Sequence, residues 1–193
     1  MRRYRSLKRL VAPAAEPVTL AEAKRHLRVD TNDEDSLISH YITTAREWCE
    51  DYLDRALVTQ QLLMRLDAFP DEIELPRPPM ATAGTATAVS ITYTTGDSLA
   101  TATLATTEYR VDRDATPGVI RNVYNGSWPS HLLDQNSVSV TWWAGYGSAA
   151  SVPHRVQTAI LMCVHELYEK RGDGHMPEAA KRLLDAASWG SYT

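Results

Sequence analysis

Residues 16–35, EPVTLAEAKRHLRVDTNDED, decide how the N-terminal part of the chain folds. Thr19 and Glu22 have the spacing of a capping box, in which the hydroxyl and the carboxylate bind amide groups that the first helical turn leaves unpaired. Basic residues follow near the other end of the segment, where cations suit the helix dipole. The pattern predicts a short amphipathic helix over residues 19–28.

A second helix start follows after only a few residues. Thr31 and Glu34 repeat the capping-box spacing, and Asp33 and Asp35 add negative charge, which is favourable in a first helical turn. Apolar residues then recur every three or four positions, namely Leu37, Ile38, Tyr41, Ile42, Ala45, Trp48, Cys49, Tyr52 and Leu53. We therefore predict a long amphipathic helix over residues 33–54.

The middle of the chain changes from a helical period to alternation. In segment 60–66 every second residue points the same way, so that Leu62, Met64 and Leu66 share a face with Gln60, and the alternation recurs in segment 137–143 through Val138, Val140 and Trp142. The prolines of residues 76–79 interrupt a strand, and Gly96-Asp97 suits a hairpin turn. Residues 57–147 are therefore predicted to form a small antiparallel β region.

Two tryptophans stand side by side in the last predicted strand. Because neighbouring strand residues face opposite ways, one of Trp142 and Trp143 is expected in the core and the other at the surface. The alternative for the surface residue is stacking on a nucleic-acid base.

The chain returns to a helical pattern after this region. Pro153 suits a helix start and Gly172 a helix end, so a helix is predicted over residues 153–171. A glycine-containing joint follows, and Pro177 opens a last amphipathic helix.

These elements define an α+β fold class. Neither amphipathic end has a partner of its own, so we expect the N- and C-terminal helices to form one mainly helical body, with the small antiparallel β region inserted. The domain organisation that we predict is a flexible basic arm at residues 1–15, a main domain at 16–171, and a jointed C-terminal helix and tail at 172–193.

Composition limits the classes of function. The formal net charge of −4 argues against a dedicated nucleic-acid-binding protein, which usually carries a positive excess. The five basic residues among the first nine either contact phosphate or an acidic neighbour, or lie in a solvated terminus. We expect neither a signal peptide nor a membrane span. Cys49 and Cys163 lie on apolar helical faces, which favours buried thiols and a reducing compartment.

No group of residues has the spacing of a catalytic or metal site. His165 and Glu166 lack the second histidine of the zinc motif H-E-x-x-H, and Cys163 lies two residues from His165, on another face of the helix. Asp112 and Asp114 lack the ligand spacing and the closing glutamate of a calcium loop. We expect no catalytic residue, no metal and no cofactor.

Both helical ends and the order of elements resemble a known family, the head-tail connector or adaptor proteins of tailed bacteriophages, prophages and gene-transfer particles. The segments that carry the resemblance are EPVTLAEAKRHLRVDTNDEDSLISHYITTAREWCEDYLDRAL at 16–57, LPRPPM at 75–80, YRVD at 109–112, SWP at 127–129 and VPHRVQTAILMCVHELYEKR at 152–171. The resemblance implies a structural virion protein that forms a ring, of twelve copies by expectation, between the portal and the tail.

The resemblance also implies partners and surfaces. Expected partners are further copies of the chain, the portal protein, a tail or tail-completion protein, and DNA that passes through the channel without specific binding; no membrane is involved. The expected location is the neck of a virion assembled in the bacterial cytoplasm. The candidate residues for docking to the portal are Leu183, Leu184, Trp189 and Tyr192. Those for contacts between subunits are Asp33, Glu34, Asp35, Arg46 and Trp48. The alternatives are a tail-completion protein or a nucleic-acid-binding module.

Overall fold

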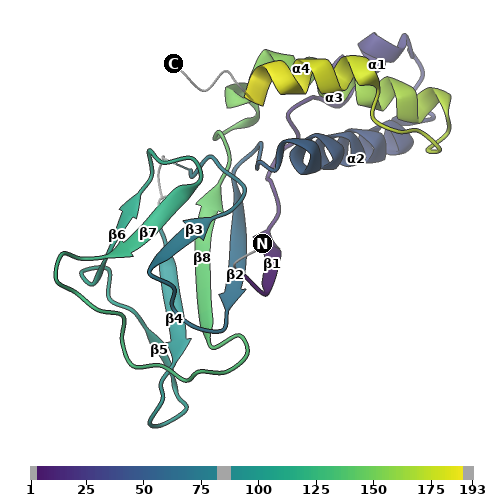
Figure 1. The fold of residues 1–193 in the computed structure, drawn as a ribbon. Helices are drawn as coiled ribbons and strands as arrows, with labels where there is room; N and C mark the ends of the chain where they lie inside the picture. The colour runs from purple at the N-terminus through teal and green to yellow at the C-terminus, as the bar shows by residue number, and fades with distance from the viewer. Residues whose placement is uncertain (1–3, 82–87, 189–193) are drawn as a thin grey trace. The chain divides into compact units, whose positions relative to one another are not determined.

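The computed structural model describes residues 4–81 and 88–188 of the chain. They form two compact units, which are described separately here. The β unit comprises Met1–Pro13 and Thr59–Gly145, and the helical unit comprises Ala14–Val58 and Tyr146–Thr193. Helices from both ends of the chain thus form one unit, and the strands form the other, which confirms the predicted α+β class (Figure 1).

The helical unit is built from α1, α2, α3 and α4, whose bounds are Leu20–Leu27, Asp35–Leu53, His154–Glu169 and Glu178–Ser188, with a short 3-10 turn at Ala149–Ser151. α2 packs against α3, and α4 packs against both. Their apolar stripes meet in one core, in which Ile38, Cys49, Ile160 and Leu184 have no exposed surface. The prediction that the N- and C-terminal helices pack into one body is confirmed.

The first predicted helix start is confirmed in detail. The Thr19 amide donates to Glu22 Oε2 at 2.8 Å, and the Glu22 amide donates to Thr19 Oγ1 at 3.2 Å, so both halves of the capping box are present. The prediction of a second capping box at Thr31 and Glu34 is wrong. α2 begins at Asp35, its N-cap residue is Glu34, and no side chain caps it. The Glu34 carboxylate binds residues of the C-terminal part instead.

The β unit contains two antiparallel sheets. The five-stranded sheet has the order β1-β2-β8-β4-β5, and the three-stranded sheet has the order β3-β7-β6. The strand bounds are Ser6–Val11 for β1, Gln60–Leu66 for β2, Glu72–Leu75 for β3, Ser90–Thr94 for β4, Thr101–Thr103 for β5, Tyr109–Asp112 for β6, Gly118–Asn122 for β7 and Val138–Ala144 for β8. The antiparallel β region and the hairpin at Gly96-Asp97 are therefore confirmed.

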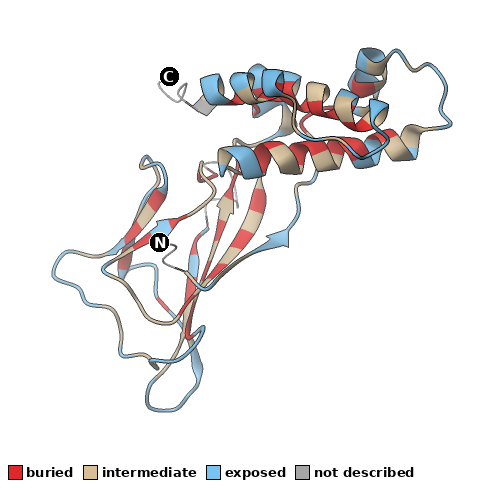
Figure 2. Ribbon diagram, turned by 45° about the vertical axis from the view of Figure 1, so that its right-hand side comes forward, coloured by how far each residue is buried: buried red, intermediate tan, exposed pale blue. Residues whose placement is uncertain are grey.

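Buried and half-buried residues alternate along β2 and β8, as the colours of the ribbon show (Figure 2). Leu62 pairs with Trp142 and Met64 with Val140, and all four side chains are buried. Trp142 is 1% exposed, whereas its neighbour Trp143 is half-buried on the other face. The prediction of one core and one surface tryptophan is confirmed.

The prediction of a flexible arm at residues 1–15 is wrong for residues 6–11. Residues 6–11 form β1, which pairs antiparallel with β2, so that Leu7 lies opposite Met64. Arg5 Nε also binds Asp67 Oδ2 at 2.6 Å. Backbone pairing with a sheet edge satisfies the amide and carbonyl groups, and an edge strand lets basic side chains reach water.

Candidate functional site

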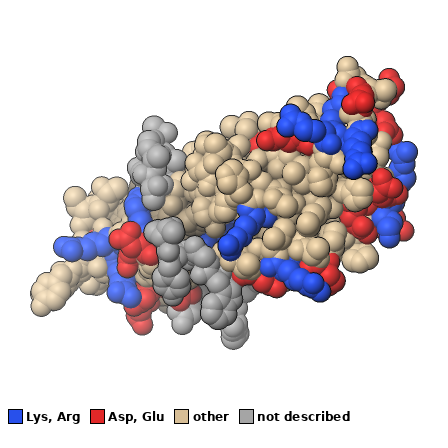
Figure 3. All heavy atoms as spheres, turned by 90° about the horizontal axis from the view of Figure 1, so that it is seen from above, with Lys and Arg blue, Asp and Glu red and all other residues tan. Residues whose placement is uncertain are grey.

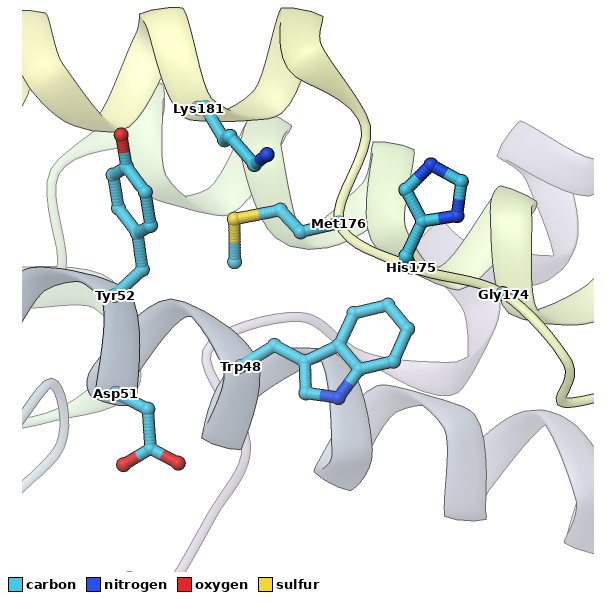
Figure 4. Close-up of a pocket in the computed structure, with 7 residues that line it drawn as sticks. All are labelled: Trp48, Asp51, Tyr52, Gly174, His175, Met176 and Lys181. Atoms are coloured by element: carbon cyan, nitrogen blue, oxygen red, sulfur yellow. The ribbon is translucent and has the colours of Figure 1, made fainter.

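An open groove of about 430 Å³ lies on the helical unit (Figure 4). Trp48, Asp51 and Tyr52 of α2 form one wall. The segment that leads into α4 forms the other with Gly174, His175 and Met176, and Lys181 of α4 completes it. The groove therefore joins a predicted interface residue, Trp48, to the joint before the last helix.

The rim of the groove is fixed by polar contacts between α2 and α4. Tyr52 is 42% exposed, and its hydroxyl donates to Asp185 Oδ1 at 2.8 Å. This hydrogen bond to a carboxylate raises the pKa of Tyr52. Lys181 Nζ lies 2.5 Å from Glu178 Oε1 within α4. Aromatic residues are enriched at protein contact sites, whose rims are polar.

Arg46, a predicted interface residue, lies inside the helical unit. Its side chain is 2% exposed, with Nη1 at 2.6 Å from Glu50 and Nε at 2.8 Å from Glu16. Burial alone would lower the pKa of Arg46, but the neighbouring carboxylates raise it. Glu50 also accepts the Leu57 amide at 3.0 Å. The cluster ties the start of the helical unit to α2, so Arg46 is not available to a partner.

The acidic residues at the start of α2 differ in their contacts. Glu34 accepts hydrogen bonds from the Tyr168 hydroxyl and from Arg171 Nη1, the latter at 2.8 Å, and these bonds lower the pKa of Glu34. Asp35 binds Lys24 Nζ at 2.7 Å. Asp33 is exposed. Figure 3 accordingly shows positive and negative side chains mixed on the face in view.

The residues predicted to dock to the portal lie in or after α4. The predicted joint does not release this helix in the structure, because α4 packs against α2 and α3. Leu184 is fully buried in the helical core, and Leu183 is half-buried against it. Trp189 and Tyr192 lie outside the described residues.

The remaining residues of chemical interest in the described ranges are the cysteines and the candidate metal ligands. No group of three His, Cys, Asp or Glu residues there has the arrangement of a metal site. Cys49 and Cys163 are free and buried, and the hydrogen bond between them together with burial raises the pKa of Cys49. Among the same residues, no helix has the length and apolar character of a membrane span.

Sequence reasoning found Trp48 but missed the rest of the groove. Tyr52 lies four residues after Trp48 and could have been found by helical spacing. The opposite wall comes from residues more than 120 positions later, and no local pattern links His175 or Met176 to α2.

Comparison with known proteins places these features in a family context. Residues 17–103 match the family model described as phage gp6-like head-tail connector protein. None of the curated proteins matches the chain.

Three solved structures share the fold over almost the whole length. A chain of "Neck of empty GTA particle computed with C6 symmetry" has a TM-score of 0.76 and 22% identity, with 94% of each chain covered. A chain of "Virion of native gene transfer agent (GTA) particle" has a TM-score of 0.74 and 23% identity, with 93% of each covered. A chain of "Neck of native GTA particle computed with C12 symmetry" has a TM-score of 0.72 and 22% identity, with 94% of each covered.

The sequence match and the fold match cover different lengths of the chain. The family model covers α1, α2 and the strands β2 to β5, whereas the shared fold covers 94% of the chain. Residues 17–103 thus carry the sequence pattern of the phage gp6-like head-tail connector family, and the resemblance seen in the sequence is confirmed.

Proposed function

We propose that this protein is a structural connector subunit of a tailed phage or phage-like particle, which assembles with copies of itself into a ring between the portal and the tail. The ring surrounds a channel for DNA and offers a platform on which the tail docks. The observation that carries the proposal is the fold match over 94% of the chain to a subunit of a gene transfer agent neck.

Cyclic symmetry in the solved necks supports the ring. The two neck structures were computed with six-fold and twelve-fold symmetry. Contacts between different patches on neighbouring copies close into rings when the rotation between copies allows closure. Twelve copies of the 21.5 kDa chain would have a mass of about 258 kDa.

The exposed predicted interface residues are the best starting points for contacts between copies. Asp33 is exposed, and Trp48 is half-buried at the groove. Glu34, Asp35 and Arg46 would act indirectly, because their charges already bind residues of the same chain.

Docking to the portal remains a proposal for α4 and the residues after it. With Leu184 buried, the contact would use the outer face of α4 and the chain that follows Ser188. Removal of residues after Ser188 should leave the helical core intact, because its described residues end with α4, and should weaken association with the portal.

Electron microscopy of particles tests the proposal directly. A version of the protein with a small tag would be incorporated into particles, and the tag would be located with a gold-labelled antibody fragment. We expect label at the neck, between capsid and tail. Label along the tail or at its end would favour a tail-completion protein, and absence from particles would overturn the proposal.

A further inference from the structure

The outer face of the five-stranded sheet has a composition unlike the rest of the chain. Strand pairing places fourteen residues on this face, opposite to the buried side: Ser6, Lys8, Val11, Gln61, Leu63, Arg65, Ser90, Thr92, Thr94, Thr101, Thr103, Ser139, Thr141 and Trp143. None of the fourteen is acidic, although the chain has 24 Asp and Glu residues and a net charge of −4. Its charged groups, Lys8 and Arg65, are both positive.

The register brings these groups together across the sheet. Lys8 of β1 lies opposite Leu63 of β2, which lies opposite Thr141 of β8. In the next row Arg65 pairs with Ser139, and Ser139 pairs with Thr92 of β4. Hydroxyl groups thus extend from the two cations across the width of the sheet. β1 is needed for this arrangement, because it adds Lys8 to the face.

The acidic residue that directly follows β2 is already paired within the chain. Asp67 directly follows β2, and its carboxylate binds Arg5 Nε at 2.6 Å and the Asn136 amide at 3.0 Å. Both hydrogen bonds lower the pKa of Asp67. Asp67 is therefore already paired with Arg5, and Lys8 and Arg65 are the two charged side chains that the strand register places on the face.

We propose that the outer face of the five-stranded sheet binds the phosphate backbone of duplex DNA without sequence preference. Lys and Arg supply the charge, and Ser, Thr and Gln side chains are common donors to phosphate oxygens. An acidic protein surface fits less well, because protein interfaces have apolar centres and only three of the fourteen residues, Val11, Leu63 and Trp143, are apolar.

Two cations in each copy make the contact weak and reversible. Each neutralised phosphate contributes about 0.9 to the slope of log affinity against log salt. One copy with two contacts would thus lose about 25-fold in affinity between 25 and 150 mM KCl. A contact of this kind holds DNA only when several copies act together, which leaves the DNA able to slide.

Fluorescence anisotropy with a labelled 30-base-pair duplex of random sequence tests the inference. The full-length protein would be titrated to about 200 μM at 25, 50, 100 and 150 mM KCl. We expect saturable binding with a log–log slope of magnitude about 1.8 for one bound copy, and a steeper slope where several copies act together. Absence of binding at 25 mM KCl would overturn the proposal.

A matched pair of double variants tests the location. Lys8→Gln with Arg65→Gln removes both cations from the face, whereas Arg121→Gln with Lys170→Gln removes two exposed cations elsewhere, so both proteins have a net charge two lower. We expect the first to lose at least about tenfold in affinity at 25 mM KCl and the second less than about twofold. Equal loss in both would overturn the assignment to this face.

Two further measurements keep the result decisive. If the Arg65 change impairs folding, Lys8→Gln alone should lower the slope by about one. Polyglutamate of equal charge should compete poorly with the duplex, and competition as strong as that of unlabelled duplex would replace DNA by an acidic protein as the occupant. The DNA contact and the proposed ring are tested independently. The sheet face is present in a single copy, so DNA binding can be measured whether or not the protein forms a ring.

Discussion

The buried charge cluster around Arg46 leads to the sharpest prediction for stability. Arg46→Met keeps most of the side-chain volume but removes the guanidinium group that lies 2.6 Å from Glu50, whose side chain is 6% exposed. Breaking one partner of a buried ion pair costs about 3–5 kcal/mol, because the remaining charge stays buried. Glu16 is 30% exposed and can regain water, so we expect the lower end, about 3 kcal/mol.

The loss is measurable as a shift in melting temperature. For a chain of this length each kcal/mol corresponds to about 2–4 °C, so Arg46→Met should lower Tm by about 6–12 °C. Circular dichroism at 222 nm during heating at pH 7 follows mainly the helices. The control is Arg121→Met, which breaks an exposed pair with Glu72 and should cost less than about 1 kcal/mol.

A double variant tests the physical cause. Arg46→Met with Glu50→Gln removes the unpaired charge, so it should recover at least half of the lost stability. The reasoning is refuted if Arg46→Met melts within about 1 °C of the natural protein, or if the double variant is no more stable than the single one.

Three further predictions concern the helical unit. The pKa of Glu34 is lowered by hydrogen bonds from a tyrosine and an arginine, so its stabilising effect is present above its ordinary value of 4.5 and is lost as pH falls through the lower folded-state value. Glu34→Gln should therefore destabilise the protein more at pH 7 than at pH 3 in urea unfolding, and equal losses would contradict this. Leu184→Ala should lower the free energy of unfolding by about 2–5 kcal/mol and Leu183→Ala by clearly less, since only Leu184 is fully buried; similar losses would argue against the packed position of α4. Cys49 and Cys163 should resist a thiol reagent such as DTNB in the native protein and both react in denaturant, and rapid native labelling would contradict their burial.

Local patterns in the sequence predicted most elements of the fold. The capping box at Thr19 and the alternation in residues 60–66 depend on neighbours within a few positions, and both are present in the structure. The second box failed because Glu34 has stronger partners far away in the sequence, Tyr168 and Arg171, which no local rule includes.

Long-range pairing explains the other errors. β1 was not predicted, because its basic residues are typical of a solvated terminus and its partners in β2 lie 50 to 59 positions later in the sequence. Arg46 was predicted as an interface residue. In the structure it is buried and binds Glu16, which is 30 positions away in the sequence. Leu184 was predicted to contact the portal. The apolar stripe of a helix has the same sequence pattern whether the helix packs on its own chain or on another protein.

The most direct test of the proposed ring is the mass of the purified protein in solution. Light scattering after size-exclusion chromatography would be measured over a wide concentration range, first alone and then with the portal protein of the same particle. We predict a closed oligomer, near 258 kDa for twelve copies, either alone or on the portal. A 21.5 kDa monomer at every concentration, unchanged by the portal, would contradict the proposal.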